Sequence, residues 1–137
     1  MAHSISPAFE DLVAEYENSA DHNDRLFQLL TDLTWVNSNL GAHRRHIEQH
    51  KLGFGDAAFH AMWLRLLDNA RRRFGTVRAL EIGVFKGQVI SLWALIAKRW
   101  HMDIQISAIT PLCGQPMPQY RLVTRLQIGR ASCRERV

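Results

Sequence analysis

The 137 residues fit a single domain of ordinary composition, with 47% hydrophobic residues, enough for a buried core, and 22% charged residues. No apolar stretch approaches the roughly 20 residues of a membrane-spanning helix, and the first residues lack the basic start and apolar run of a secretory signal. These features argue against a membrane protein and predict a soluble, cytoplasmic one.

Residues 128–137 differ from the rest of the chain. They show no apolar periodicity, and their sequence, IGRASCRERV, resembles a translated sequencing adapter, so we expect them not to belong to the natural protein. Without their three arginines and one glutamate, the formal net charge falls from +4 to +2. This small charge, with the arginines at 71–73 near a predicted helix end, does not indicate nucleic-acid binding. Cys113 is then the single cysteine, which excludes a disulfide and predicts a reducing compartment.

Helices are predicted over the first part of the chain. A serine followed by a proline is typical of a helix start and predicts a helix over residues 7–19. Leucines at helical spacing predict a second helix, which starts at Asp21 or Asn23. It should end before a loop over residues 37–41, and a short polar helix is expected over residues 43–50.

A helix, strand, helix and strand are predicted to follow. Asp56 is expected to cap a helix with apolar residues every three or four positions, and Gly75 to end it. A buried strand over residues 77–82, a helix over 87–101 and a second strand over 103–109 complete the pattern. A strand, helix and strand in this order predict two parallel strands and an α/β fold.

The stretch VRALEIGVFKGQ, residues 77–88, carries the main functional signal. Glu81 lies near the end of the predicted strand, and Gly83 and Gly87 bracket the turn, where a ligand can approach the backbone beyond the sheet edge. The sequence LEIGVFKGQVISLW resembles motif I of class I S-adenosylmethionine-dependent methyltransferases, an acid followed by two spaced glycines. With the bulky Phe85 between the glycines, it is also similar to small-molecule O-methyltransferases of the cephalosporin-hydroxylase-like group.

The resemblance spans about residues 77–112 and implies a fold and a cofactor. The fold would be the start of a Rossmann-like, doubly wound methyltransferase domain, over residues 56–127, after a helical segment over 1–55. S-adenosylmethionine would be the cofactor and a small-molecule oxygen the acceptor. The implied cofactor-binding residues are Glu81, Gly83, Val84, Phe85, Gly87 and Thr110. The family usually has a ribose-binding acid at the last position, where a threonine makes one hydrogen bond but no bidentate pairing.

Two other functions compete for the same residues. A non-catalytic α/β binding module would keep the turn for folding, with Glu81 near Arg78 or a helix terminus. A dinucleotide-dependent oxidoreductase is disfavoured because Phe85 stands where the G-x-G-x-x-G pattern has its second glycine. Since two strands do not complete a doubly wound sheet, we expect the chain to be an inactive part of its methyltransferase, with no catalytic residue assigned.

The histidines and tryptophans are interpreted as structural. His43, His46 and His50 share a helix face, but the neighbouring cations and the lack of an H-E-x-x-H pattern disfavour a metal site. A polar surface helix or a lid facing the substrate is expected instead. His60 is predicted to lie at the core boundary, Lys86 in solvent, and the four tryptophans in the core.

Overall fold

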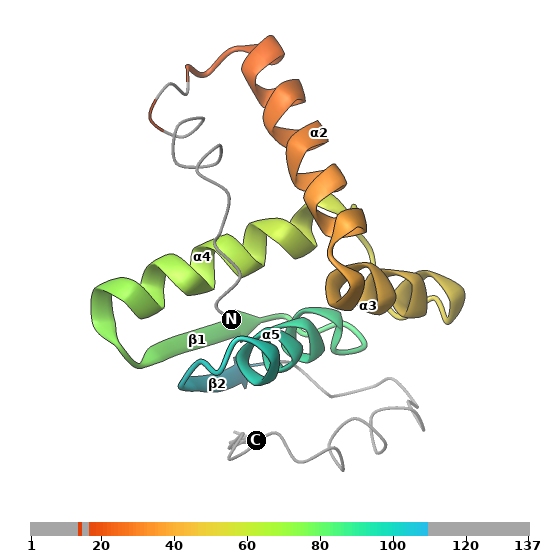
Figure 1. Cartoon of the computed structure of the whole chain (residues 1–137). Helices are drawn as coiled ribbons and strands as arrows, with labels where there is room; N and C mark the ends of the chain where they lie inside the picture. Colours follow the sequence, from red (N-terminus) through yellow and green to blue (C-terminus); the bar gives the residue numbers. More distant parts are fainter. Residues whose placement is uncertain (1–13, 15–16, 110–137) are drawn as a thin grey trace.

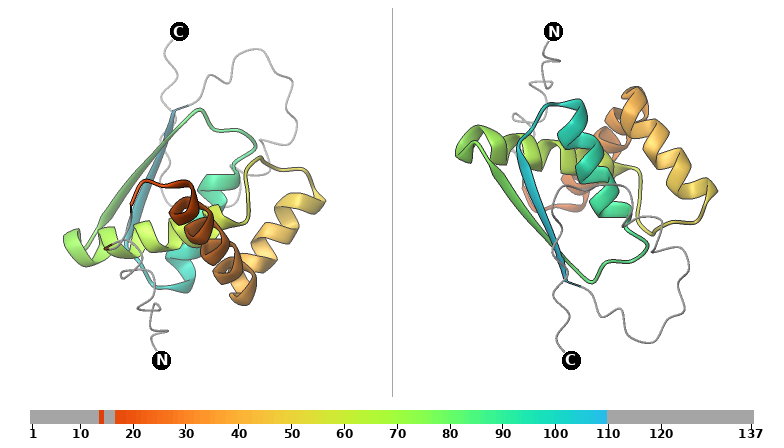
Figure 2. Two further views of the ribbon diagram at one scale, coloured as in Figure 1. Left: turned by 90° about the horizontal axis from the view of Figure 1, so that it is seen from above. Right: turned by 90° about the horizontal axis from the view of Figure 1, so that it is seen from below.

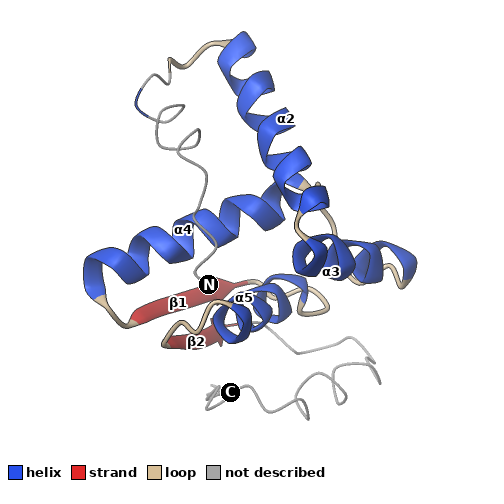
Figure 3. Ribbon diagram, viewed as in Figure 1, coloured by secondary structure: helices blue, strands red, loops and turns tan. Residues whose placement is uncertain are grey.

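The computed structural model describes residue 14 and residues 17–109 (Figure 1). These residues form four named helices and two strands (Figure 3): α2 (Ala20–Val36), α3 (Ser38–Gln49), α4 (Ala58–Phe74), β1 (Val77–Ile82), α5 (Gln88–Arg99) and β2 (Ile104–Ile109). The mixture of helices with a parallel sheet confirms an α/β fold. Most of the helix predicted over residues 7–19 lies outside the described residues, as does Thr110.

Side-chain caps decide where α2 and α3 begin. The Ser19 hydroxyl accepts a hydrogen bond from the His22 N–H at 3.3 Å, so α2 starts before the predicted positions. The loop predicted over residues 37–41 is wrong. Asn37 Oδ1 accepts hydrogen bonds from the backbone N–H groups of Asn39 and Leu40, both at 3.1 Å, and α3 begins directly after it. Asparagine favours both turns and helix caps, and here it joins two helices with no loop between them.

The start of α4 also differs from the prediction, whereas its end agrees. The first turn has no side-chain cap from Asp56, because the capping position is Ala57. Instead, Thr34 of α2 places its hydroxyl oxygen 2.7 Å from the Ala57 carbonyl oxygen and accepts the Ala61 N–H at 3.1 Å. The buried hydroxyl therefore serves the backbone of α4 and ties it to α2. Gly75 ends the helix with φ +74°, as predicted.

The two strands pair in parallel, with Val77 opposite Ile104 and Ile82 opposite Ile109. Both strand positions agree closely with the prediction. On the other hand, β1 is not a fully buried strand, since Leu80 is 53% exposed and residues at alternate positions of both strands face solvent. The views from above and below show α3 and α5 to one side of the two strands (Figure 2). In the described part of the chain, helices thus cover one sheet face only.

One hydrophobic core joins all these elements. Its buried members come from the four named helices and both strands, with Leu30 and Leu40 packed in the same cluster as Trp93 and Ile106. The tryptophan prediction holds in part: Trp93 is buried, but Trp35 is 40% exposed. None of the described helices combines the length and apolar character needed to cross a bilayer.

Candidate functional site

The glycine turn lies where β1 ends and α5 begins. Gly83 and Gly87 both adopt left-handed backbone conformations, with φ +82° and +77°, so the predicted bracketing of the turn is confirmed. The Gly83 N–H donates to the Ile109 carbonyl at 2.8 Å, which holds the turn against the end of β2. A Cβ atom at Gly83 would meet none of the described residues within 4 Å. The glycine is therefore needed for its backbone conformation, and open space lies beside it.

Glu81 lies on the helix-covered face of β1, next to the first turn of α5. Its carboxylate accepts a hydrogen bond from the Ile90 backbone N–H, while its buried Oε2 atom has no hydrogen-bond partner among the described residues. Burial raises the pKa of the Glu81 carboxyl, and the hydrogen bond from Ile90 partly opposes this shift. The side chain thus contacts a helix terminus, one of the two alternatives foreseen, and keeps one oxygen that could accept a further hydrogen bond.

The connection between α3 and α4 packs onto the glycine turn. The Phe54 and Phe85 rings stack with their centroids 4.8 Å apart and 21° between their planes. Lys86 donates from Nζ to the Lys51 carbonyl at 2.9 Å and lies 5.3 Å from the centroid of the Phe85 ring. Lys86 is partly exposed, in line with the predicted solvent contact, and its ammonium group also ties the turn to Lys51. Val84 is partly buried and packs against the core.

A chain of hydrogen bonds that the sequence did not suggest joins α3, α4 and α5. His43 Nδ1 lies 3.0 Å from His60 Nε2, and His43 Nε2 lies 3.0 Å from Ser91 Oγ. Ser91 Oγ in turn donates to the Gln88 carbonyl at 2.9 Å. His60 is fully buried, so the prediction that it lies at the core boundary is wrong. Its neighbour in sequence, Phe59, is the more exposed of the two.

The two hydrogen-bonded imidazoles, those of His43 and His60, are neutral at pH 7. Burial lowers the pKa of His43 to about 4 and that of His60 to about 3, and the positive charge of Arg44 adds to both shifts. Because the Ser91 hydroxyl donates to a carbonyl, it must accept from His43, so His43 carries its proton on Nε2. His43 Nδ1 is then an acceptor, so His60 also carries its proton on Nε2. His43 then donates to Ser91 rather than activating it as a nucleophile. Within the part of the chain that the structure describes, the buried His60 Nδ1 has no hydrogen-bond partner.

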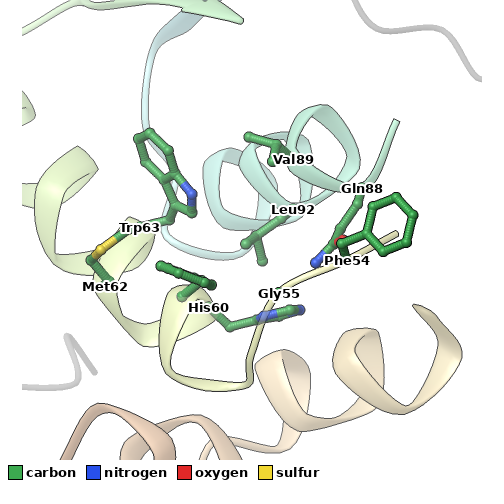
Figure 4. Close-up of a pocket in the computed structure, with 9 residues that line it drawn as sticks. Phe54, Gly55, His60, Met62, Trp63, Gln88, Val89 and Leu92 are labelled. Carbon is green, nitrogen blue, oxygen red and sulfur yellow. The ribbon is translucent and has the colours of Figure 1, made fainter. Parts of the chain in front are cut away.

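A cavity of about 390 Å³ opens beside the hydrogen-bonded side chains of His43, His60 and Ser91. It lies between α4, α5 and residues 54–55 (Figure 4). Its lining is mostly apolar and comes from three segments: Phe54, Phe59, Met62, Trp63, Val89 and Leu92. Gln88 and His60 are the polar side chains in the lining. The cavity lies next to the glycine turn because Gln88 and Val89 are the first two residues of α5.

The structure brings five of the six predicted cofactor-binding residues to one end of the sheet; the sixth, Thr110, lies outside the described residues. Sequence reasoning missed the contact of His43 with His60 and Ser91, because these positions are 17 and 48 residues apart from it. It also missed the cavity. Among the described residues, no group of three or more histidines, cysteines or acids is placed to hold a metal ion.

Comparisons with known proteins identify no relative. The chain matches no protein family, and no curated protein or solved structure is significantly similar to it. The resemblance to methyltransferases accordingly depends on the motif LEIGVFKGQVISLW alone.

Proposed function

We propose that the chain supplies part of the S-adenosylmethionine site of a cytoplasmic methyltransferase with a Rossmann-like domain, which methylates an oxygen of a small molecule. The observation that carries this proposal is the pairing of Glu81 with Gly83 at the carboxyl end of β1. Glu81 has a buried Oε2 atom with no partner among residues 17–109, and no residue of that range fills the space beside the Gly83 backbone. Ligands of open α/β sheets bind at this edge.

The cofactor's amino acid part fits this pairing chemically. Its ammonium group is a hydrogen-bond donor that could satisfy Glu81 Oε2, and a nearby positive charge favours the ionised carboxylate. Burial raises the pKa of Glu81, and binding of an ammonium group beside the carboxylate should lower that pKa again. At Gly83 a ligand could approach the backbone closely, since no Cβ blocks it.

The chemistry of the cofactor determines what the cofactor and the residues of this chain each contribute to the proposed reaction. When bound, the sulfonium group supplies an already activated methyl group. The residues of this chain would hold and orient the donor through Glu81 and the glycine turn, which lowers the entropy cost of reaction. No described residue is assigned to remove the acceptor's proton.

A non-catalytic α/β binding module is the second candidate, favoured by the contact between Glu81 and the first turn of α5. The Ile90 N–H that donates to the carboxylate belongs to the helix start, where backbone donors lack partners within the helix. In that case the acid caps α5, and the glycines serve only the turn. The two candidates differ in whether an adenosyl ligand binds.

Equilibrium dialysis of the 137-residue chain against labelled S-adenosylmethionine separates them. Saturable binding is expected, and Gly83→Val should abolish it by blocking the approach to the backbone. Gly75→Val is the matched control, because Gly75 also has a positive φ, +74°, and a Cβ atom placed there would likewise meet nothing within 4 Å. The backbone strain is thus comparable, but only Gly83 lies at the proposed site.

Two further measurements complete the test. Glu81→Gln should weaken binding by about tenfold, the usual scale for a hydrogen bond to a charged group. An excess of a nicotinamide dinucleotide should not compete, whereas competition would favour the oxidoreductase. The methyltransferase proposal fails if no saturable binding is seen, or if the Gly75 and Gly83 variants lose binding equally.

A further inference from the structure

The cavity beside α5 has the volume of a small-molecule site. Its volume of about 390 Å³ falls within the about 300–1,000 Å³ that is typical of ligand pockets. Aromatic side chains form much of its wall, with Phe59 and Trp63 on α4 and Phe54 on the preceding connection. Phe54 is 79% exposed, so the cavity opens to solvent at this edge.

The Gln88 amide supplies both a hydrogen-bond donor and an acceptor to the cavity. Gln88 is only 8% exposed, and Figure 4 shows its side chain beside Phe54. A Cβ atom on Gly53 would collide with Gln88 Oε1, so the close approach of the Gly53 backbone holds the amide in place. Within the described part of the chain, no residue makes a hydrogen bond to this side-chain amide. His60, the other polar side chain of the lining, already bonds to His43.

The lining also excludes charged ligands. No charged side chain of the described residues lines the cavity, and an ion moved there from water would lose its hydration without gaining a counter-charge. Aromatic walls favour flat apolar rings, which they contact by stacking or by their edges. A primary amide can both donate and accept, so it pairs well with a hydroxyl group, which does the same.

We propose that this cavity binds a neutral aromatic molecule of two fused rings that carries one hydroxyl group. The rings occupy the space between Trp63 and Val89, and the hydroxyl group pairs with the Gln88 amide. This site is separate from the proposed contacts of Glu81 and Gly83 with S-adenosylmethionine. It therefore does not depend on the methyltransferase proposal.

Calorimetric titration of the chain with three probes, without any adenosyl ligand, tests the chemical class. 2-Naphthol should bind saturably with one molecule per chain. Naphthalene, which lacks the hydroxyl group, should bind about fivefold more weakly, the scale of one hydrogen bond. 2-Naphthoate, which is negatively charged, should show no saturable binding. Absence of saturable 2-naphthol binding, equal affinities for 2-naphthol and naphthalene, or tight binding of 2-naphthoate would each overturn the proposal.

Three variants place the ligand. Gln88→Met keeps the length of the side chain but removes its hydrogen bonding, so it should lower the affinity for 2-naphthol about fivefold and leave naphthalene unchanged. Val89→Phe fills the cavity and should abolish binding of both. Leu66→Phe is the control, because Leu66 is 46% exposed on α4 and outside the cavity lining. Circular dichroism checks that each variant is folded. Unchanged 2-naphthol binding in either the Gln88 or the Val89 variant contradicts the assignment.

Discussion

Lowering the pH from 7 to 5 should destabilise the fold through the pair His43 and His60. Burial is the main cause that lowers both pKa values, to about 4 and about 3, from an ordinary value of 6.5. Between pH 6.5 and these values the unfolded chain binds protons at both imidazoles, whereas the folded chain does not. The free energy of unfolding must therefore fall as the pH falls. The positive charge of Arg44, next to His43 on α3, opposes protonation of both imidazoles further.

The loss in the free energy of unfolding follows from the size of the two pKa shifts. Between pH 7 and pH 5 each histidine lowers the free energy of unfolding by about 2 kcal/mol, because the folded-state pKa values lie below this window. Together they remove about 4 kcal/mol, a large share of the roughly 5–15 kcal/mol that stabilises an ordinary domain. Glu81 acts in the opposite direction: its raised pKa favours the folded state as its carboxyl becomes protonated.

Urea unfolding at pH 7, 6 and 5, followed by circular dichroism, measures this effect. His43→Asn leaves only one of the two buried imidazoles, so it should lose about half as much stability over this range as the unmodified chain. His101→Asn removes an exposed imidazole and serves as the control, with the full loss expected. If the unmodified chain is equally stable at pH 7 and pH 5, or if His43→Asn loses as much as the control, the buried neutral pair is refuted.

Three further substitutions test the packing. Thr34→Val should cost about 1–3 kcal/mol, because it removes the buried hydroxyl that accepts the Ala61 N–H and contacts the Ala57 carbonyl. The same change at the partly exposed Thr31, whose hydroxyl donates to the Phe27 carbonyl of its own helix, should cost about 0.5 kcal/mol or less in thermal unfolding. Equal costs would contradict a role of the Thr34 hydroxyl at the start of α4. Gly53→Ala should cost about 1–3 kcal/mol in urea unfolding, since its Cβ would collide with Gln88; an unchanged midpoint would show that the contact relaxes freely. Ser19→Ala should cost about 1 kcal/mol by removing the cap of α2, and a helical signal and stability like those of the unmodified chain would argue against that cap.

Local patterns were sufficient for the order of elements around the turn. Both strands and α5 lie close to their predicted bounds, because alternation and helical spacing are properties of neighbouring residues. Gly75, Gly83 and Gly87 lie in left-handed conformations, as a helix end and a tight turn require. Asn37 suits both a loop and a helix cap, so the local pattern predicts a loop where the structure has the cap of α3.

The sequence by itself determined the α/β order and the glycine turn, and it placed Glu81 beside that turn. Only the tertiary structure decided that α4 takes its first-turn hydrogen bond from Thr34, that His43 lies between His60 and Ser91, and that Phe54 stacks on Phe85. These contacts join residues far apart in the chain, so no local periodicity encodes them. Packing of the helices on one side of two strands brings them together, and the same packing creates the cavity beside α5.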